Sequence, residues 1–271
     1  MSGMSYEQHS VLHQFLHPGK SYPTLDEAAI AGTLGTPIEM YRQIKAELAA
    51  GTHRAAEELL ADPDFAARVD RLPFAAGSTV TGLGDSITDD LQSWIEILRN
   101  LLSLRRPQDN IRVLNAGFSG DTTTNILRRF IGVVAENPAW IICMIGTNDA
   151  TRQGSDALGV VVSPQETEKN LALMRHYAEM HTSAKWVWIT PYAVIPEMIA
   201  SHWFLSTLQL EIRNEDINAV VEAVRRQPDP IVDLQKALGL PVNPDYMLDD
   251  GLHPSLSGQK AIVRALVERL T

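Results

Sequence analysis

The sequence predicts an α/β protein with three α/β/α layers and about five parallel strands, preceded by a helical extension. From about residue 78 onward, short and almost wholly apolar runs alternate with longer segments of helical pattern. Apolar runs of this kind are typical of strands that are buried on both faces of a parallel sheet. Residues 1–75 contain no such run. We therefore expect a helical N-terminal extension over 1–75 and an α/β domain over 76–271.

The extension is expected to hold three helices: "TLDEAAIAG", "TPIEMYRQIKAELAAG" and "THRAAEELLADPDFAARVDRL". Each segment opens on Thr, and the first two end near Gly, which suits helix N-caps and C-caps. These helices would form either a cap over a functional site or a surface through which the protein forms a homo-oligomer. Their composition does not choose between the two.

The α/β part is expected to alternate strictly between strands and helices, so right-handed crossovers would join parallel strands. The apolar runs cover 78–84, 111–117, 139–146, 185–191 and 230–234. The helical patterns cover 89–104, 122–135, 165–181, 204–226 and 255–270. The one cysteine, Cys143, lies within the third apolar run and is expected to be a core residue.

Composition and charge exclude several classes of partner. The net charge of the 271 residues is −10 and no Lys/Arg cluster occurs, which disfavours nucleic acid and anionic membrane surfaces. No run of 18 apolar residues is present, and the first 20 residues lack the apolar core of a signal peptide. We expect a cytoplasmic protein without membrane insertion, whose partner is a small molecule.

Polar residues follow the predicted strands, at the edge of the sheet where ligands bind in such folds. Ser86 follows the first strand, and a serine needs a base before it becomes a nucleophile. His253 could be that base, with Asp250 or Asp249 as its acidic partner in "DDGLHP". The backbone N–H groups of Ser86 and Gly120 and the side-chain amide of Asn148 could bind an oxyanion. Taken alone, Ser86 could also be a helix N-cap.

Four short motifs carry a resemblance to a known family. "GDS", "NAGFSGDT", "GTND" and "DGLHP" resemble, in order and spacing, the four sequence blocks of the SGNH hydrolases, also called the GDSL esterase/lipase family. The similarity covers roughly residues 78–271 and is greatest to the thioesterase/lysophospholipase branch. Ile87 stands where the family usually has Leu, and the N-terminal extension is unusual for the family.

The resemblance implies the flavodoxin-like SGNH hydrolase fold over 76–271 and a serine hydrolase that cleaves carboxylic esters or thioesters. It implies Ser86 as nucleophile, His253 as general base, Asp250 as the residue that orients His253, and an oxyanion hole from Ser86, Gly120 and Asn148. It implies no cofactor and no metal. Two alternatives remain, a carbohydrate O-deacetylase and a non-catalytic ligand-binding protein on the same scaffold. Acyl transfer to an alcohol in place of water also stays open.

Other polar residues have simpler structural interpretations. Asp85, Asp121 and Asp149 are expected to brace their loops through hydrogen bonds. His9, His13 and His17 recur every four residues and would share a helix face. Two such histidines can bind zinc, but no cluster of cysteines or carboxylates joins them. The better explanation is a short terminal helix with partly exposed histidines, which is either frayed or packed on the body of the protein.

The substrate pocket is expected to lie between two loops, 151–164 and 192–204. Arg152 could meet an anionic leaving group or simply be solvated. The second loop holds an apolar cluster that could be either core packing or an acyl-binding wall. The members of the cluster are Val194, Ile195, Met198, Ile199, Trp203 and Phe204. If it is a wall, the substrate is a short to medium acyl or aryl ester.

Overall fold

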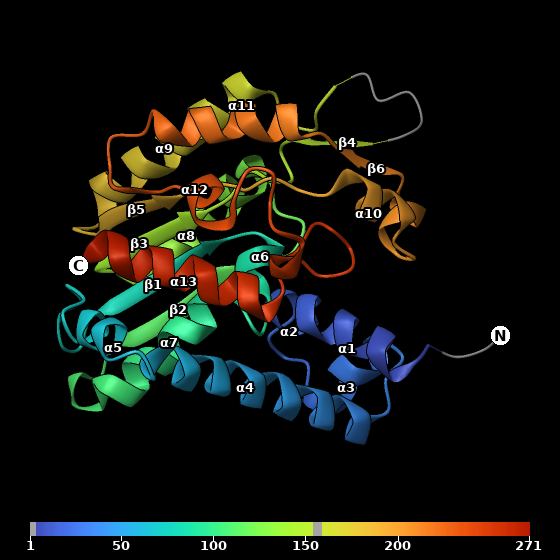
Figure 1. Cartoon of the computed structure of the whole chain (residues 1–271), viewed down its shortest axis with the longest axis horizontal. Helices are drawn as coiled ribbons and strands as arrows, with labels where there is room; N and C mark the ends of the chain where they lie inside the picture. The colour runs from blue at the N-terminus through green and yellow to red at the C-terminus, as the bar shows by residue number, and fades with distance from the viewer. Residues whose placement is uncertain (1–3, 154–158) are drawn as a thin grey trace.

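A computed structural model, which describes residues 4–153 and 159–271, shows three layers around a parallel sheet (Figure 1). The five strands of the sheet run in the order β2-β1-β3-β5-β7. Their bounds are β1 (Thr79–Gly84), β2 (Arg112–Gly117), β3 (Trp140–Met144), β5 (Lys185–Ile189) and β7 (Ile231–Val232). The predicted fold class is confirmed, and each of these five strands lies within one of the predicted apolar runs.

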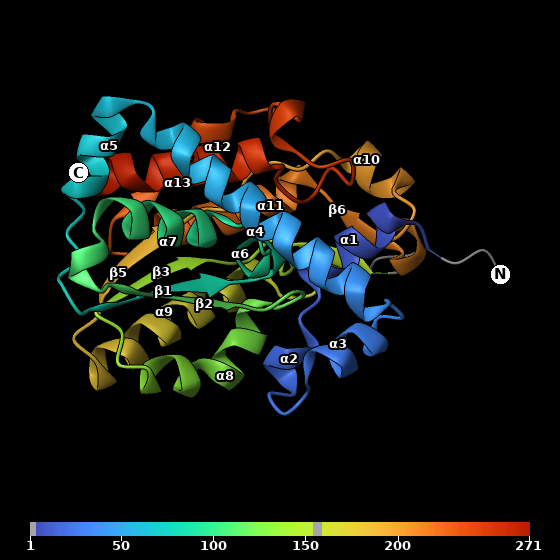
Figure 2. The same cartoon turned by 90° about the horizontal axis from the view of Figure 1, so that it is seen from below.

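Helices cover both faces of the sheet, as Figure 2 shows from the side. One face carries α7 (Trp94–Arg105), α12 (Leu234–Leu238) and α13 (Leu256–Leu270). The other face carries α8 (Thr123–Ala135), α9 (Pro164–His181) and α11 (Asn214–Arg225). None of the helices in the described part of the chain is long and apolar enough to cross a membrane.

The strands are apolar throughout because both of their faces are buried. In β3, Ile142 and Met144 belong to the core under α7 and α13, whereas Ile141 and Cys143 belong to the core under α8 and α9. All five residues of β3 are buried. Successive side chains of a strand point to opposite faces, so a strand between two helical layers needs apolar residues at every position.

Residues of the N-terminal extension form five helices that pack on the body of the protein. They are α1 (Tyr6–Phe15), α2 (Pro18–Ser21), α3 (Glu27–Thr33), α4 (Ile38–Leu60) and α5 (Pro63–Asp70). Of these, α4 contacts α7, α13 and α1, so it joins the start of the chain to one helical layer.

Two predicted helix boundaries in the extension are wrong. The third predicted helix, over 52–72, is interrupted between α4 and α5, where Asp62 accepts from the backbone N–H groups of Asp64 and Phe65 and caps a new helix. The helix α4 continues through Gly51 and Thr52, where the sequence suggested an end and a new start. A Cβ at Gly51 would lie 2.3 Å from Nε2 of Gln92, so the glycine permits a close contact and does not end the helix. The hydroxyl of Thr52 donates to the carbonyl of Leu48 within the same helix, at 2.9 Å.

The helix expected over 204–226 is also only partly present. It begins at Asn214, and the residues before it form a 3₁₀ helix, η2 (Leu205–Leu208), and a strand, β6 (Leu210–Ile212). This strand pairs in an antiparallel manner with β4 (Thr151–Gln153). The remaining short elements are α6 (Ser86–Asp89), α10 (Pro196–Ser201), η1 (Pro107–Asp109) and η3 (Pro244–Tyr246).

Candidate active site

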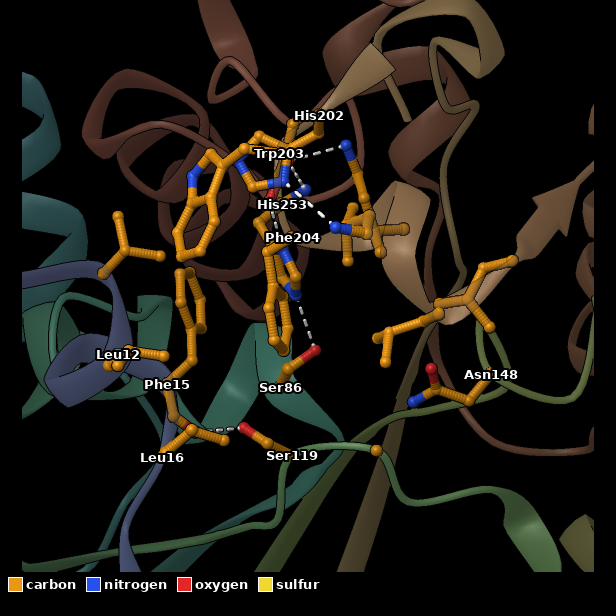
Figure 3. Close-up of a pocket in the computed structure, with 17 residues that line it drawn as sticks. Leu12, Phe15, Leu16, Ser86, Ser119, Asn148, His202, Trp203, Phe204 and His253 are labelled. Atoms are coloured by element: carbon orange, nitrogen blue, oxygen red, sulfur yellow. Dashed lines mark hydrogen bonds and ion pairs between the residues drawn. The ribbon is translucent and has the colours of Figure 1, made fainter. Parts of the chain in front are cut away.

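Three of the predicted residues form a chain of hydrogen bonds at the carboxyl end of the sheet. Ser86 is the first residue of α6, directly after β1, and Asp85 caps this helix by accepting from the backbone N–H of Ile87. The Oγ of Ser86 lies 2.8 Å from Nε2 of His253 (Figure 3). Nδ1 of the same imidazole lies 2.6 Å from Oδ2 of Asp250. The hydroxyl, the imidazole and the carboxylate therefore stand in the order that activation of a serine requires.

The turn before α13 fixes Asp250 relative to His253. Oδ1 of Asp250 accepts from the backbone N–H groups of Leu252 and His253, both at 2.8 Å. Gly251, which follows Asp250 in this turn, has a φ of 66°, which favours glycine. Asp249, the alternative acidic partner, has a side chain that is 87% exposed and lies 4.0 Å from Nε2 of His202. The structure thus brings Asp250, and not Asp249, to His253.

The electrostatics of the pair favour a basic imidazole. Burial lowers the pKa of His253, but the charge and hydrogen bond of Asp250 outweigh this and hold the pKa above its usual value. Burial raises the pKa of Asp250, but the interactions with His253 outweigh it and hold this pKa below its usual value. The ring of Phe15 covers the imidazole, with the two ring centroids 4.3 Å apart.

Three hydrogen-bond donors lie at the same cavity as Ser86. Gly120 has a φ of 85°, and no atom lies within 4 Å of the place where its Cβ would be. The backbone N–H groups of Gly120 and Ser86 donate to no acceptor in the described part of the chain. Nδ2 of Asn148 donates to the carbonyl of Asp121 at 2.9 Å, and its second hydrogen remains for another acceptor. These donors suit a developing oxyanion.

The acidic residues next to the donors hold the loops in place. Asp149 accepts from the backbone N–H of Thr123 and from the hydroxyl of Thr167, both at 2.9 Å. Asp121 pairs with Arg129, with Nε and Oδ2 2.6 Å apart.

Asp85, directly before the serine, is more unusual, because its Oδ2 is buried and has no hydrogen-bond partner among the described residues. Burial raises the pKa of Asp85 to about 7.

A cavity of about 280 Å³ opens above Ser86. Its floor is polar and consists of Ser86, Ser119, Gly120, Asn148, Asp250 and His253. Helix α1 and the residue after it form one wall with Val11, Leu12, Phe15 and Leu16. The segment from the end of α10 to β6 forms another wall, with His202 and the apolar residues Trp203, Phe204, Leu205, Leu208 and Leu210. In Figure 3, Asn148 lies across the cavity from Leu12, Phe15 and Leu16.

The predicted substrate residues separate into two groups. Trp203 and Phe204 line the cavity, whereas Arg152, Val194, Ile195 and Met198 do not. Arg152 forms two hydrogen bonds to the carboxylate of Asp216, at 2.7 and 2.9 Å.

The other three residues of this group pack against other parts of the protein, Val194 buried and Ile195 and Met198 half-buried. Val194 is buried in an apolar cluster with Ile199 and Ile217. Ile195 and Met198 both lie against Gly251, within 3.2 Å of where its Cβ would be.

The four wall residues in and directly after α1 carry no signal in the sequence that marks them as cavity residues. Their apolar pattern in "SVLHQFL" is that of any helix packed on a protein, and nothing in it indicates a contact with His253.

The three histidines of this region bond to protein groups. Thr36 Oγ1 lies 2.8 Å from Nδ1 of His9 and 2.7 Å from Nε2 of His13, and Nδ1 of His17 lies 2.8 Å from Oδ1 of Asp89. Within residues 4–153 and 159–271, no group of three or more potential ligands could hold a metal ion.

Comparison with known proteins identifies the family. Residues 83–261, well over half of the chain, match the GDSL-like lipase/acylhydrolase family. The chain belongs to this family. The resemblance to the SGNH hydrolases is therefore confirmed, and the protein is an ester-hydrolysing enzyme.

Two curated relatives are esterases. The chain is 33% identical to esterase TesA of Pseudomonas aeruginosa over 110 residues, which are 38% of this chain and 50% of TesA. It therefore spans only about half the length of that relative. It is 24% identical to an acetylxylan esterase of Geobacillus stearothermophilus over 221 residues, which are 73% of this chain and 96% of the relative.

Solved structures show the same fold. LAE5, an alpha/beta hydrolase enzyme from the metagenome of Lake Arreo, has a TM-score of 0.56 and 23% identity, covering 73% of this chain and 96% of LAE5. The acetylxylan esterase Axe2 of Geobacillus stearothermophilus also has a TM-score of 0.56 and 23% identity, covering 72% of this chain and 95% of Axe2. In both comparisons about a quarter of this chain has no counterpart.

Proposed function

We propose that the protein hydrolyses small carboxylic esters or thioesters through an acyl-enzyme on Ser86. The observation that carries this proposal is the contact of 2.8 Å between Oγ of Ser86 and Nε2 of His253 on the floor of a mostly apolar cavity. The hydrogen bond from Nδ1–H of His253 to Asp250 leaves Nε2 as the proton acceptor. No cofactor is needed for this reaction.

The acylation step uses the groups on the floor of the cavity. His253 takes the proton of Ser86 as Oγ attacks the acyl carbon, and Asp250 stabilises the imidazolium that forms. The N–H groups of Ser86 and Gly120 and the amide of Asn148 bind the oxyanion. The tetrahedral intermediate then collapses, and His253 gives its proton to the departing alcohol or thiol. An acyl ester of Ser86 remains.

The deacylation step repeats this sequence with water. Water attacks the acyl carbon while His253 removes its proton, and the second intermediate releases the carboxylic acid as Ser86 recovers its hydrogen. If an alcohol attacks in place of water, the same groups transfer the acyl chain.

The cavity favours an apolar acyl group of short to medium length. Its walls are formed almost entirely by aliphatic and aromatic side chains, with His202 as an exception, and they enclose about 280 Å³ above Ser86. Burying apolar surface contributes about 25 cal/mol per Å², so each methylene that reaches these walls strengthens binding.

A second candidate is a carbohydrate O-deacetylase. The observation that favours it is the similarity to an acetylxylan esterase along 73% of the chain. An acetyl group is small enough for the floor of the cavity, and the sugar would then contact the walls. Aromatic side chains such as Trp203, which is 41% exposed, could pack on a sugar ring.

The test is hydrolysis of p-nitrophenyl esters from acetate to palmitate beside acetylated xylose, by the wild type and by Ser86→Ala. We expect a maximum at a short to medium acyl chain, weak activity on the acetylated sugar, and no turnover by the folded variant. Preferred cleavage of the acetylated sugar would select the deacetylase. Full activity of Ser86→Ala would refute the acyl-enzyme on Ser86.

A further inference from the structure

Asp89 connects the start of the chain to the loop that carries Gly120. It is the last residue of α6, three positions after Ser86, and only 2% of it is exposed. Oδ2 of Asp89 accepts from the backbone N–H of Ser119 at 2.9 Å, and the hydroxyl of Ser119 lies 3.0 Å from the same oxygen. Ser119 directly precedes Gly120. The carboxylate therefore holds the loop one residue away from an oxyanion donor.

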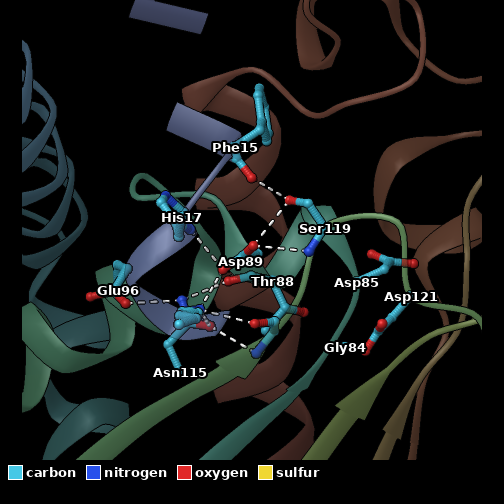
Figure 4. Close-up of polar contacts among 12 residues, drawn as sticks. Phe15, His17, Gly84, Asp85, Thr88, Asp89, Glu96, Asn115, Ser119 and Asp121 are labelled. Carbon is cyan, nitrogen blue, oxygen red and sulfur yellow. Dashed lines mark hydrogen bonds and ion pairs between the residues drawn. The ribbon is translucent and has the colours of Figure 1, made fainter. Parts of the chain in front are cut away.

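The other oxygen of Asp89 is held by the N-terminal segment (residues 5–21). Oδ1 accepts from Nδ1 of His17 at 2.8 Å and from Nζ of Lys20. Figure 4 shows Asp89 between His17 on one side and Ser119 on the other. Burial raises the pKa of Asp89, but the interactions with His17 and Lys20 outweigh it and hold the pKa below its usual value, so the carboxylate is charged.

The N-terminal segment also contacts the loop directly. Nζ of Lys20 donates to the carbonyl of Gly117 at 2.9 Å, at the point where β2 ends and the loop begins. The hydroxyl of Ser119 lies between Oδ2 of Asp89 and the carbonyl of Phe15, and its one hydrogen donates to either. A Cβ at Gly117 would lie 2.4 Å from the backbone nitrogen of Asp89, so the loop and α6 are in close contact.

These anchors lie outside the region that the chain shares with its family. The family match begins at residue 83, whereas Phe15, His17 and Lys20 belong to the extension. The carboxylate of Asp89 thus bonds to two separate parts of the chain, one through each oxygen. Because the hydrogen bonds share one carboxylate, they strengthen each other and link the two parts rigidly. Charge-assisted hydrogen bonds of this kind are about twice as strong as neutral ones.

We propose that Asp89 is a positioning residue, held by His17 and Lys20 of the N-terminal segment, that keeps the loop of Ser119 and Gly120 in place for catalysis. This inference rests on the proposed acyl-enzyme mechanism. In it, Asp89 does not touch the substrate and acts through the backbone N–H of Gly120. The N-terminal segment is then part of the catalytic apparatus and not only a cover.

The test compares Lys20→Met and Lys20→Arg with the wild type on a p-nitrophenyl ester of medium chain length. Lys20 is preferred to Asp89 because its side chain is 33% exposed, so its replacement leaves the core intact. Loss of a whole oxyanion donor lowers kcat by about 10²–10³-fold, and misplacement of one should cost less. We expect Lys20→Met to lower kcat by about 10-fold with KM within about 2-fold, and Lys20→Arg to restore most of kcat.

The matched control is Lys45→Met. This lysine of the extension lines one small cavity with His17 and Lys20, but it pairs with Glu27, and no ion pair joins it to Asp89 in the described part of the chain. It should retain the kcat of the wild type. Unchanged kcat in Lys20→Met would overturn the inference. So would a loss of kcat accompanied by an equal loss in Lys20→Arg or Lys45→Met, because that pattern indicates general destabilisation.

Ser86→Ala in the same assay separates this inference from the proposed function. If the wild type is active and Ser86→Ala is not, the proposed function stands, whatever Lys20→Met does. If the wild type hydrolyses no ester, or Ser86→Ala is as active as the wild type, the proposed function fails and the inference fails with it. Asp89→Asn, measured with its melting temperature, provides a second variant: a folded protein with unchanged kcat would also overturn the inference.

Discussion

The floor and the walls of the cavity are built in different ways. The floor is polar, lies at the ends of β1, β2 and β3 and in the turn before α13, and falls wholly within the residues that match the family. The walls are largely apolar. One of them comes from α1, outside the family match, and the other from the irregular segment between α10 and β6. The floor thus lies wholly within the region shared with the family, whereas the space for the substrate is shaped by the N-terminal extension together with a segment inside the family match.

The largest expected effects come from the floor. His253→Ala should lower kcat by about 10⁶-fold and Asp250→Asn by about 10⁴-fold, because the acid only orients and stabilises the imidazole. The losses should be similar for every ester that the wild type cleaves, since the floor acts on the carbonyl group. Steady-state kinetics on acetate and octanoate esters would measure this. If the loss of kcat differs widely with acyl chain length, the floor does not act on the carbonyl group alone, and this assignment of roles to floor and walls is wrong.

Substitutions in the walls should change which acyl chain length the enzyme prefers and leave catalysis on the shortest ester intact. Leu12→Trp fills space beside α1, and Leu208→Trp fills space at the other wall. We expect each to lower kcat/KM for p-nitrophenyl octanoate by at least about 10-fold while acetate stays within about 2-fold, because one methylene in an apolar pocket is worth about 10–200-fold.

Leu104→Trp is the matched control for these variants. Leu104 lies on α7 and is 39% exposed, close to the 43% of Leu208, but it does not line the cavity. Its substitution should leave the chain-length profile as in the wild type. Equal losses for acetate and octanoate in the wall variants would show that α1 and η2 support the floor and do not select the acyl chain.

The pH dependence of activity probes the floor alone. The neutral imidazole is the active form, so kcat/KM should fall as the pH drops through the pKa of His253, which Asp250 holds above 6.5. Asp250→Asn removes that charge, and the acid limb should move to lower pH. Leu12→Trp should not move it. A pH–rate profile whose acid limb is unchanged in Asp250→Asn would contradict the assignment.

The smallest expected effect concerns stability. Burial raises the pKa of Asp85 from 3.8 to about 7, so the folded protein binds this proton more tightly than the unfolded chain does. The contribution of Asp85 to stability is therefore highest below about pH 4 and declines as the pH rises to about 7. The melting temperature of Asp85→Asn, relative to the wild type, should rise by a few degrees between pH 5 and pH 8. An identical difference at both pH values would disprove this account.

The sequence predicted the floor better than the walls for physical reasons. Ser86, Asn148 and His253 sit directly after strands or in a short turn, and local sequence patterns specify such junctions. The wall at η2 lies within the helix predicted over 204–226, and Leu205, Leu208 and Ile212 do recur there at helical spacing. Its true form depends on pairing with β4, more than 50 residues earlier, and on a left-handed φ of 51° at Gln209.

The wall at α1 could not be predicted from local patterns at all. Phe15 and His253 stack with ring centroids 4.3 Å apart, although they lie at opposite ends of the sequence. The spacing of apolar residues shows which face of a helix is buried, but not what that face is buried against. Only the fold shows that α1 lines the cavity.

The exposure of Trp203 gives the protein a built-in optical reporter. The protein has five tryptophans, of which Trp94, Trp140, Trp186 and Trp188 are at most 8% exposed and Trp203 is 41% exposed on the cavity wall. Iodide in solution should quench the fluorescence of Trp203 and leave the fluorescence of the four buried tryptophans unquenched. A molecule that enters the cavity should shield Trp203 from iodide, so the fluorescence of unlabelled protein can measure occupancy even for ligands that are never cleaved.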